Sequence, residues 1–156
     1  MTWQRGRDAF TEDTNIHILV LRRVDTRFTL VKPVVWMGSS LKDLKTFPKR
    51  VQAGVGHALY AAQRGATDPA AKPLRGFGGS SVMEITDRYD GDTFRAAYTA
   101  TLGTTVYVLH VFQKKATKGI GTPKRHIDLI RARLKAAERL QKEEQATLTW
   151  RQRNTP

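Results

Sequence analysis

The sequence predicts an α+β fold with four strands and three helices. Short apolar runs bounded by glycine, serine, aspartate or threonine recur at 34–37, 82–86, 93–102 and 105–115, as is typical of strands. Between the first two runs, helix caps and an apolar stripe of helical period indicate two helices. A third helical stripe follows the last run and closes the fold.

The first strand is expected at 34–37, and the two helices are expected at 40–47 and 48–64. Ser40 and Asp43 have the spacing of a capping box, which marks the start of the first helix. A proline opens the second helix, where its fixed φ suits the first turn. The apolar stripe of the second helix consists of Val51, Val55, Ala58, Leu59 and Ala62.

The segment 67–79 is rich in proline, alanine and glycine and is expected to be a loop. A strand follows at 82–86, and Asp90-Gly91-Asp92 has the composition of a turn into the next strand. Thr122-Pro123 then supplies an N-cap and a first-turn proline for the last helix. The stripe of that helix is Ile127, Ile130, Leu134 and Ala137. We expect this stripe to pack on the core; a docking seam for a partner is the alternative.

Length and charge limit the class of protein. The 156 residues favour one domain, and the net charge of +13 favours a polyanionic partner such as nucleic acid or the ribosome. A basic protein without such a partner is the alternative. The absence of cysteine excludes disulfides and thiolate metal sites, and no apolar run is long enough to span a membrane. We therefore expect a cytoplasmic protein.

Residues 1–31 show no clear period and are expected to form an extension outside the main fold. A strand over Ile16–Leu21, or a translation start at Val31, are the alternatives. The main domain is expected over 32–144, followed by a flexible polar tail at 145–156.

The strands 93–102 and 105–115 are predicted to form a hairpin around a two-residue turn, Gly103-Thr104. In that register Arg95 lies opposite Phe112. One face is expected to be core: Phe94, Ala96, Tyr98, Ala100, Tyr107, Leu109 and Val111. The other face holds Thr93, Arg95, Ala97, Thr99, Thr101, Val106, Val108, His110, Phe112 and Lys114.

This second face has the chemistry for cleaving RNA through the RNA's own 2′-hydroxyl. That reaction needs a base, a cation at the phosphate and an acid for the leaving oxygen. Arg95 suits a phosphate clamp, while Lys114 and Lys115 suit charge stabilisation, or proton transfer if their pKa is lowered. His110 suits proton transfer and Phe112 suits stacking on a base. We expect Arg95 and Lys114 to be exposed. A structural histidine, a core phenylalanine and a solvated strand end are the alternatives.

A basic segment follows the hairpin. Between Gln113 and Arg133 there are seven Lys or Arg residues and a single acidic residue, Asp128. Such a run is suited to bind a polyanion. The residues expected to bind RNA are Arg75, Phe112, Lys118, Lys124, Arg125 and His126.

Other patterns for chemistry are weak. The glycine-rich loop 76–79 lacks the lysine of a phosphate-binding P-loop. The four histidines do not have metal-ligand spacing, and the aspartates at 87, 90 and 92 fit a turn. No nucleophile elbow is present. We expect neither a metal nor another cofactor.

Four segments resemble a known family: KPVVWMGSSLKDLKTFPKRVQ, GDTFRAAYT, VYVLHVFQKK and GTPKRHIDLIRARL. They are similar to phage-derived toxins of the RelE/HigB type, within the RelE/ParE superfamily, over about Lys32 to Glu144. The resemblance implies two N-terminal helices packed on a mostly antiparallel four-stranded sheet, plus a C-terminal helix. It also implies catalytic roles for Arg95, Lys114 and Lys115, with weaker correspondences at His110 and His126.

The resemblance implies a type II toxin that cleaves mRNA on the ribosome without a metal. Its implied partners are mRNA, the ribosome and a helix-turn-helix antitoxin, with no membrane. The alternative is a non-enzymatic toxin or nucleic-acid-binding module, as in the ParE branch, which acts on a DNA gyrase.

Overall fold

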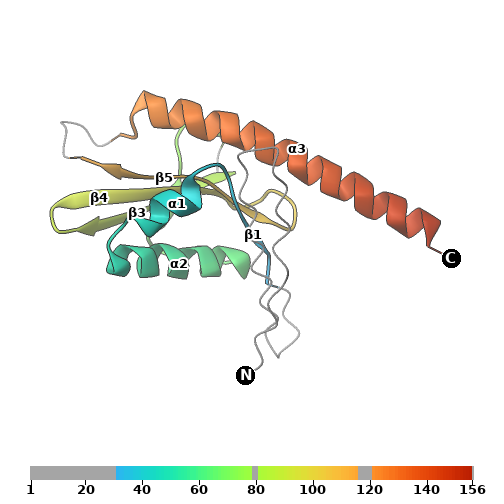
Figure 1. The fold of residues 1–156 in the computed structure, drawn as a ribbon, viewed down its shortest axis with the longest axis horizontal. Coiled ribbons are helices and arrows are strands. Elements are labelled where there is room, and N and C mark those ends of the chain that lie inside the picture. The colour runs from blue at the N-terminus through green and yellow to red at the C-terminus, as the bar shows by residue number, and fades with distance from the viewer. Residues whose placement is uncertain (1–30, 79–80, 116–120, 156) are drawn as a thin grey trace, which may run out of the picture.

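The computed structural model describes residues 31–78, 81–115 and 121–155 as a five-stranded mixed sheet with helices on both faces (Figure 1). The order of the strands in the sheet is β1-β5-β4-β3-β2. Helix α2 lies across one face and α3 across the other. The elements are β1 (Val34–Trp36), α1 (Ser40–Lys45), α2 (Lys49–Gln63), β2 (Ala71–Pro73), β3 (Val82–Tyr89), β4 (Asp92–Thr99), β5 (Val106–Lys114) and α3 (Lys124–Asn154).

The α+β class and the last helix are confirmed, but the sheet differs from the expectation in two respects. Strand β1 pairs with β5 in parallel, because α1 and α2 carry the chain away from β1 before it returns to the sheet. A fifth strand, β2, pairs with the edge of β3 inside the segment expected to be a loop. Its three residues include Pro73, which is tolerated at a sheet edge but conceals the strand in the sequence.

Strands β3 and β4 form a tight hairpin around Asp90 and Gly91. Both residues have positive φ, 52° and 81°, as a two-residue turn of type I′ requires. This turn fixes eight successive residue pairs, from Tyr89 with Asp92 to Val82 with Thr99. Glu84 pairs with Ala97 in this hairpin, so Glu84 and Arg95 are diagonal neighbours on the same face of the sheet.

The β4–β5 hairpin has the predicted register at its open end and a different one near its turn. Arg95 pairs with Phe112 as predicted, and Ala97 pairs with His110. Tyr98 then pairs with Val108, so Leu109 is an extra residue in β5, a β-bulge. The bulge reverses the alternation of faces on its turn side.

The predicted face assignment is therefore wrong for four residues of β5 near the turn. Val106 and Val108 pack in the core with α2, while Tyr107 and Leu109 pack in the core with α3. Strand β4 ends at Thr99, so the connection is longer than the predicted two residues.

Two apolar cores lie on opposite faces of the sheet. The first contains the predicted stripe of α2 together with Phe94, Ala96 and Tyr98. The second contains Ile130 and Ala137 of α3, with Ile127 and Leu134 partly buried beside them. The predicted packing of the α3 stripe on the core is thus confirmed.

Helix α3 extends ten residues past Glu144, to Asn154, where the sequence predicted a frayed tail. That prediction of local structure is wrong, because the last turns contain strong helix formers and no glycine or proline. Its last turns project beyond the sheet (Figure 1), and Leu148 and Trp150 are exposed. The expected extension, residues 1–30, lies outside the described residues.

Among the described helices, none combines the length and apolar character needed to cross a lipid bilayer.

Candidate functional site

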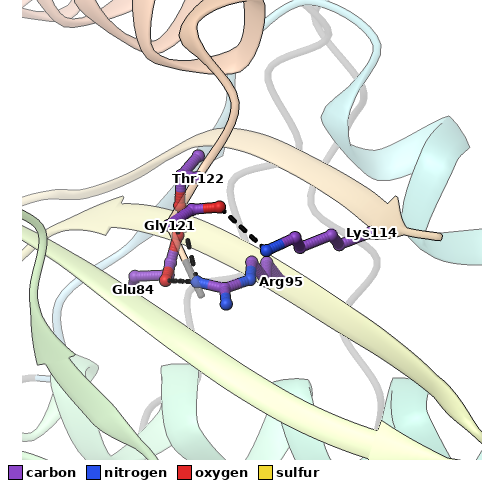
Figure 2. A network of polar contacts seen from close by, with 5 residues as sticks. All are labelled: Glu84, Arg95, Lys114, Gly121 and Thr122. Carbon is purple, nitrogen blue, oxygen red and sulfur yellow. Dashed lines mark hydrogen bonds and ion pairs between the residues drawn. The ribbon is translucent and has the colours of Figure 1, made fainter. Parts of the chain in front are cut away.

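The N-terminus of α3 is tied to the sheet by a buried polar network (Figure 2). The Arg95 guanidinium forms an ion pair with Glu84, and the two side chains are only 11% and 9% exposed. Thr122, just before α3, donates a hydrogen bond to the second carboxylate oxygen of Glu84 at 2.7 Å. Arg95 also donates to the Thr122 hydroxyl at 3.4 Å. The expectation that Arg95 is exposed is therefore wrong.

Glu84 was not predicted as a site residue. The signal in the sequence was a single carboxylate within the apolar strand Val82–Thr86, because such a residue is rarely buried without a cationic partner. Arg95 supplies that partner from the neighbouring strand.

Lys114 approaches the same segment from the end of β5. Its ammonium donates a hydrogen bond to the carbonyl oxygen of Gly121 at 2.9 Å, and Figure 2 shows Lys114 and Arg95 beside the Gly121–Thr122 segment. The predicted grouping of Arg95 with Lys114 on one face is confirmed. The face is not open along its length, because the start of α3 covers it.

Three rings form a stack next to this network. The ring of Phe112 lies against the ring of His126, with centroids 3.9 Å apart and an interplanar angle of 12°. His110 stacks on both, at 5.0 Å from each, and its Nε2 lies 2.9 Å from Nδ1 of His126. His110 and Phe112 are 7% and 6% exposed, whereas His126 is half-buried. His126 is therefore the most exposed ring of the three.

Arg133 completes the cluster from the second turn after His126. Its Nη1 donates to the carbonyl oxygen of Leu109 at 2.9 Å and to Nδ1 of His110 at 3.2 Å. Its Nη2 donates to the hydroxyl of Ser39, which in turn donates to Asp43. Sequence reasoning counted Arg133 only as part of the basic segment. Its spacing of seven from His126 indicates the same helix face.

The environment favours the neutral form of both imidazoles. Burial, the guanidinium of Arg133 and the nearby His126 lower the pKa of His110 to about 4, against a smaller opposing effect of Asp43. Burial, followed by the charge of Arg125, lowers the pKa of His126. Both rings are therefore neutral at pH 7.

The remaining predicted residues fall into three groups. Lys115 is exposed directly after β5, and Lys124 and Arg125 are exposed in the first turn of α3, where Lys124 pairs with Asp128 at 2.6 Å. Arg75 is exposed in the loop after β2, and this loop meets α3 at Arg131, whose guanidinium lies over the ring of Phe77. Lys118 lies outside the described residues.

The described part of the chain contains no group of three histidine, cysteine or carboxylate side chains arranged to hold a metal ion. What the arrangement does offer is a set of cationic and N–H donors at a helix N-terminus. Such a set can bind phosphate groups and stabilise developing negative charge.

Comparison with known proteins gives one family match. The model of a family described as phage derived protein Gp49-like (DUF891) matches residues 42–135, which is more than half of the chain. That region contains α2, strands β2 to β5, and the first part of α3 with His126 and Arg133. No curated protein matches the chain.

Proposed function

Because this chain belongs to the Gp49-like family of phage-derived proteins, a family related to RelE/HigB-type toxins, we propose that it is a type II toxin that cleaves mRNA on the ribosome without a metal. The observation that carries the proposal is the meeting of Lys114 with the start of α3. The 2.9 Å hydrogen bond from Lys114 to Gly121 joins the ammonium at the end of β5 to the segment that leads into α3, whose first residues are Lys124, Arg125 and His126.

These groups suit an RNA backbone. The partial positive charge of a helix N-terminus favours a phosphate, and the lysines add full charges beside it. The 2′-oxygen attacks the adjacent phosphorus, and its proton passes to a base from solvent. The new P–O2′ bond replaces the P–O5′ bond, so the products are a 2′,3′-cyclic phosphate and a 5′-hydroxyl. Lys114 and Lys115 stabilise the phosphorane and protonate the leaving 5′-oxygen.

Arg95 and His110 take indirect roles in this proposal. Arg95 is buried against Glu84 and holds Thr122, so it positions the start of α3. His110 is buried behind His126 and has both ring nitrogens engaged. His126, on the outer side of the stack, is the residue that meets the RNA.

The test is cleavage of an mRNA programmed on ribosomes by protein that has been treated with EDTA and then dialysed free of it, so that the Mg²⁺ that holds the ribosome together is kept. Lys114→Ala/Lys115→Ala is expected to lower the cleavage rate by ~100-fold or more, as loss of transition-state charge stabilisation does. The matched control is Lys45→Ala/Lys49→Ala, which removes the same charge from two exposed lysines of α1 and α2. Equal rates for the two double variants would contradict the proposed site.

A non-enzymatic toxin of the ParE type is the second candidate. The burial of Arg95 and His110 favours it, since it leaves fewer ionisable groups that a substrate can touch. Growth arrest with intact mRNA on induction of the chain would support this second candidate and contradict the first.

We further propose a helix-turn-helix antitoxin that covers the basic face. An exposed cationic surface attracts acidic segments of a partner. Co-expression with neighbouring small open reading frames is expected to restore growth and yield a complex. Good growth on expression of the chain alone, with no neighbour binding it, would contradict the toxin–antitoxin assignment.

A further inference from the structure

Within the proposed function, on which this inference rests, we infer that His126 is a fixed N–H donor to a phosphate oxygen and that Arg133 and His110 are the positioning residues that fix it. The inference follows from the directions of the hydrogen bonds in the cluster. An arginine guanidinium has only donors, so each contact it makes requires an acceptor on the other side.

The contact with Arg133 sets the tautomer of His110. Arg133 donates to Nδ1 of His110 at 3.2 Å, so this nitrogen carries a lone pair. A neutral imidazole has one N–H group, which must then lie on Nε2. Nε2 of His110 is 2.9 Å from Nδ1 of His126 and donates to it.

His110 in turn sets the tautomer of His126. Because Nδ1 of His126 accepts a hydrogen bond, its own N–H group lies on Nε2. The opposite tautomer would require two lone pairs and no proton on His110, which neutral imidazole cannot provide. The chain Arg133–His110–His126 is thus directional, and the lone pair of His126 is already used. His126 is therefore a hydrogen-bond donor and not a proton acceptor.

A second arginine competes for the opposite tautomer. The Nε of Arg125 donates toward Nε2 of His126 at 3.4 Å, and this contact alone would place the proton of His126 on Nδ1. The contact of Arg133 with His110 is shorter, at 3.2 Å, and partly buried, and Arg133 is also held by the carbonyl oxygen of Leu109, whereas Arg125 is exposed. The contact of Arg133 therefore sets the tautomer, and the exposed Arg125 gives way. Arg125 and Nε2–H of His126 are then two donors at the start of α3, where one phosphate oxygen can accept from both.

The burial of the cluster supports the constraint. Arg133 is also held by the carbonyl oxygen of Leu109 and the hydroxyl of Ser39, and Phe112 stacks on His126 at 3.9 Å. The rings of His110 and His126 are therefore both held in place. The low pKa of His110 keeps it neutral, which preserves its accepting nitrogen over the physiological range.

The direct test is long-range ¹H–¹⁵N NMR of the histidine rings at pH 7.5, which needs no catalysis. The wild-type protein is expected to show Nε2–H on both His110 and His126. Arg133→Met is expected to give mixed tautomers at His110, whereas the control Arg131→Met on the same helix leaves both rings unchanged. An Nδ1–H tautomer at either ring of the wild type would overturn the inference.

A second test separates donor from base. His126→Gln keeps an N–H donor but has no titratable nitrogen, whereas His126→Phe keeps only the stacking. If His126 donates, the glutamine variant retains cleavage within about 10-fold of wild type and the phenylalanine variant loses ~100-fold or more. Equal losses would show that His126 accepts a proton and would overturn the inference.

The phosphate itself is probed with a 2′-O-methyl RNA octamer, which binds but cannot be cleaved. Titration is expected to shift the His126 Nε2–H resonance, and His126→Phe is expected to bind about 10-fold more weakly. If the resonance shifts but the protein does not cleave RNA, His126 is a phosphate donor and the proposed function is wrong. If RNA binds tightly and the resonance does not change, His126 is not the donor to the phosphate.

Discussion

Replacing Arg95 by alanine is expected to destabilise the domain severely, because it leaves the Glu84 carboxylate buried without its counter-charge. The two side chains are 11% and 9% exposed, so water cannot replace the lost guanidinium. The hydroxyl of Thr122 remains as a hydrogen-bond donor to Glu84. Breaking one partner of a buried ion pair costs about 3–5 kcal/mol, out of a total stability of about 5–15 kcal/mol.

Urea unfolding followed by circular dichroism measures this loss. With a slope of about 2 kcal/mol per molar urea, the midpoint is expected to fall by ~2 M. The matched control is Arg50→Ala, which breaks the ion pair of Arg50 with Asp87 on the same strand as Glu84. The side chain of Arg50 is 60% exposed, so this change is expected to cost about 0–1 kcal/mol.

The double variant Glu84→Leu/Arg95→Met separates the attraction between the two charges from the cost of burying them. Replacing both charges removes the desolvation cost as well as the attraction, so its stability is expected to return to within about 1 kcal/mol of wild type or to exceed it. If Arg95→Ala loses no more stability than Arg50→Ala, the ion pair does not hold the start of α3.

Three further predictions concern pH, packing and salt. The pKa of His110 is lowered from 6.5 to about 4, so the stability conferred by its neutral ring is complete above pH 6.5 and is lost as pH falls toward 4, by up to about 3 kcal/mol. Urea unfolding at pH 7.5 and 4.5 measures this loss, and His110→Gln should make the loss smaller. An equal loss in the wild type and the variant would contradict the prediction. Gly103 has φ of +60°, and a Cβ added there would collide with the Gln141 side chain, so Gly103→Ala should lower the stability of the domain by ~1–2 kcal/mol. The control is Gly56→Ala in α2, where an added Cβ would meet no atom within 4 Å; this change should raise the thermal midpoint. Binding of 2′-O-methyl RNA should weaken with a log–log salt slope of about −0.7 per phosphate contacted, and Lys124→Ala/Arg125→Ala should make that slope shallower by about 1; a slope near zero would exclude polyanion recognition.

The sequence predicted the register of the candidate site better than that of the rest of the hairpin. The alternation of residues from Arg95 to Ala97 and from His110 to Lys114 is regular, so the register holds there. The bulge at Leu109 has no signal in local composition, since the apolar run Val106–Leu109 suits either face when both faces of the sheet are covered. The second face of the sheet is covered by α3, and the sequence of the strands alone does not show this.

Roles in the site were harder to predict than positions. Arg95 was expected to be exposed because it lies on the face of the hairpin opposite the predicted core face. Its burial depends on Glu84 and Thr122, which are distant in sequence. The stacking surface expected at Phe112 is covered by His126, which arrives on α3. In both cases a contact between separate elements decides the chemistry of the side chain.

The most direct test of the central claim is the chemistry at a single nucleotide. A ribosome-bound mRNA is first cleaved by the wild-type protein, which has been stripped of metal with EDTA and dialysed, to locate the cut. The same mRNA is then made with a 2′-deoxynucleotide on the 5′ side of that cut. We predict a 2′,3′-cyclic phosphate from the first mRNA and no cleavage of the second at that position. Cleavage of the 2′-deoxy mRNA at an unchanged rate, or growth arrest with every mRNA intact, would contradict the account.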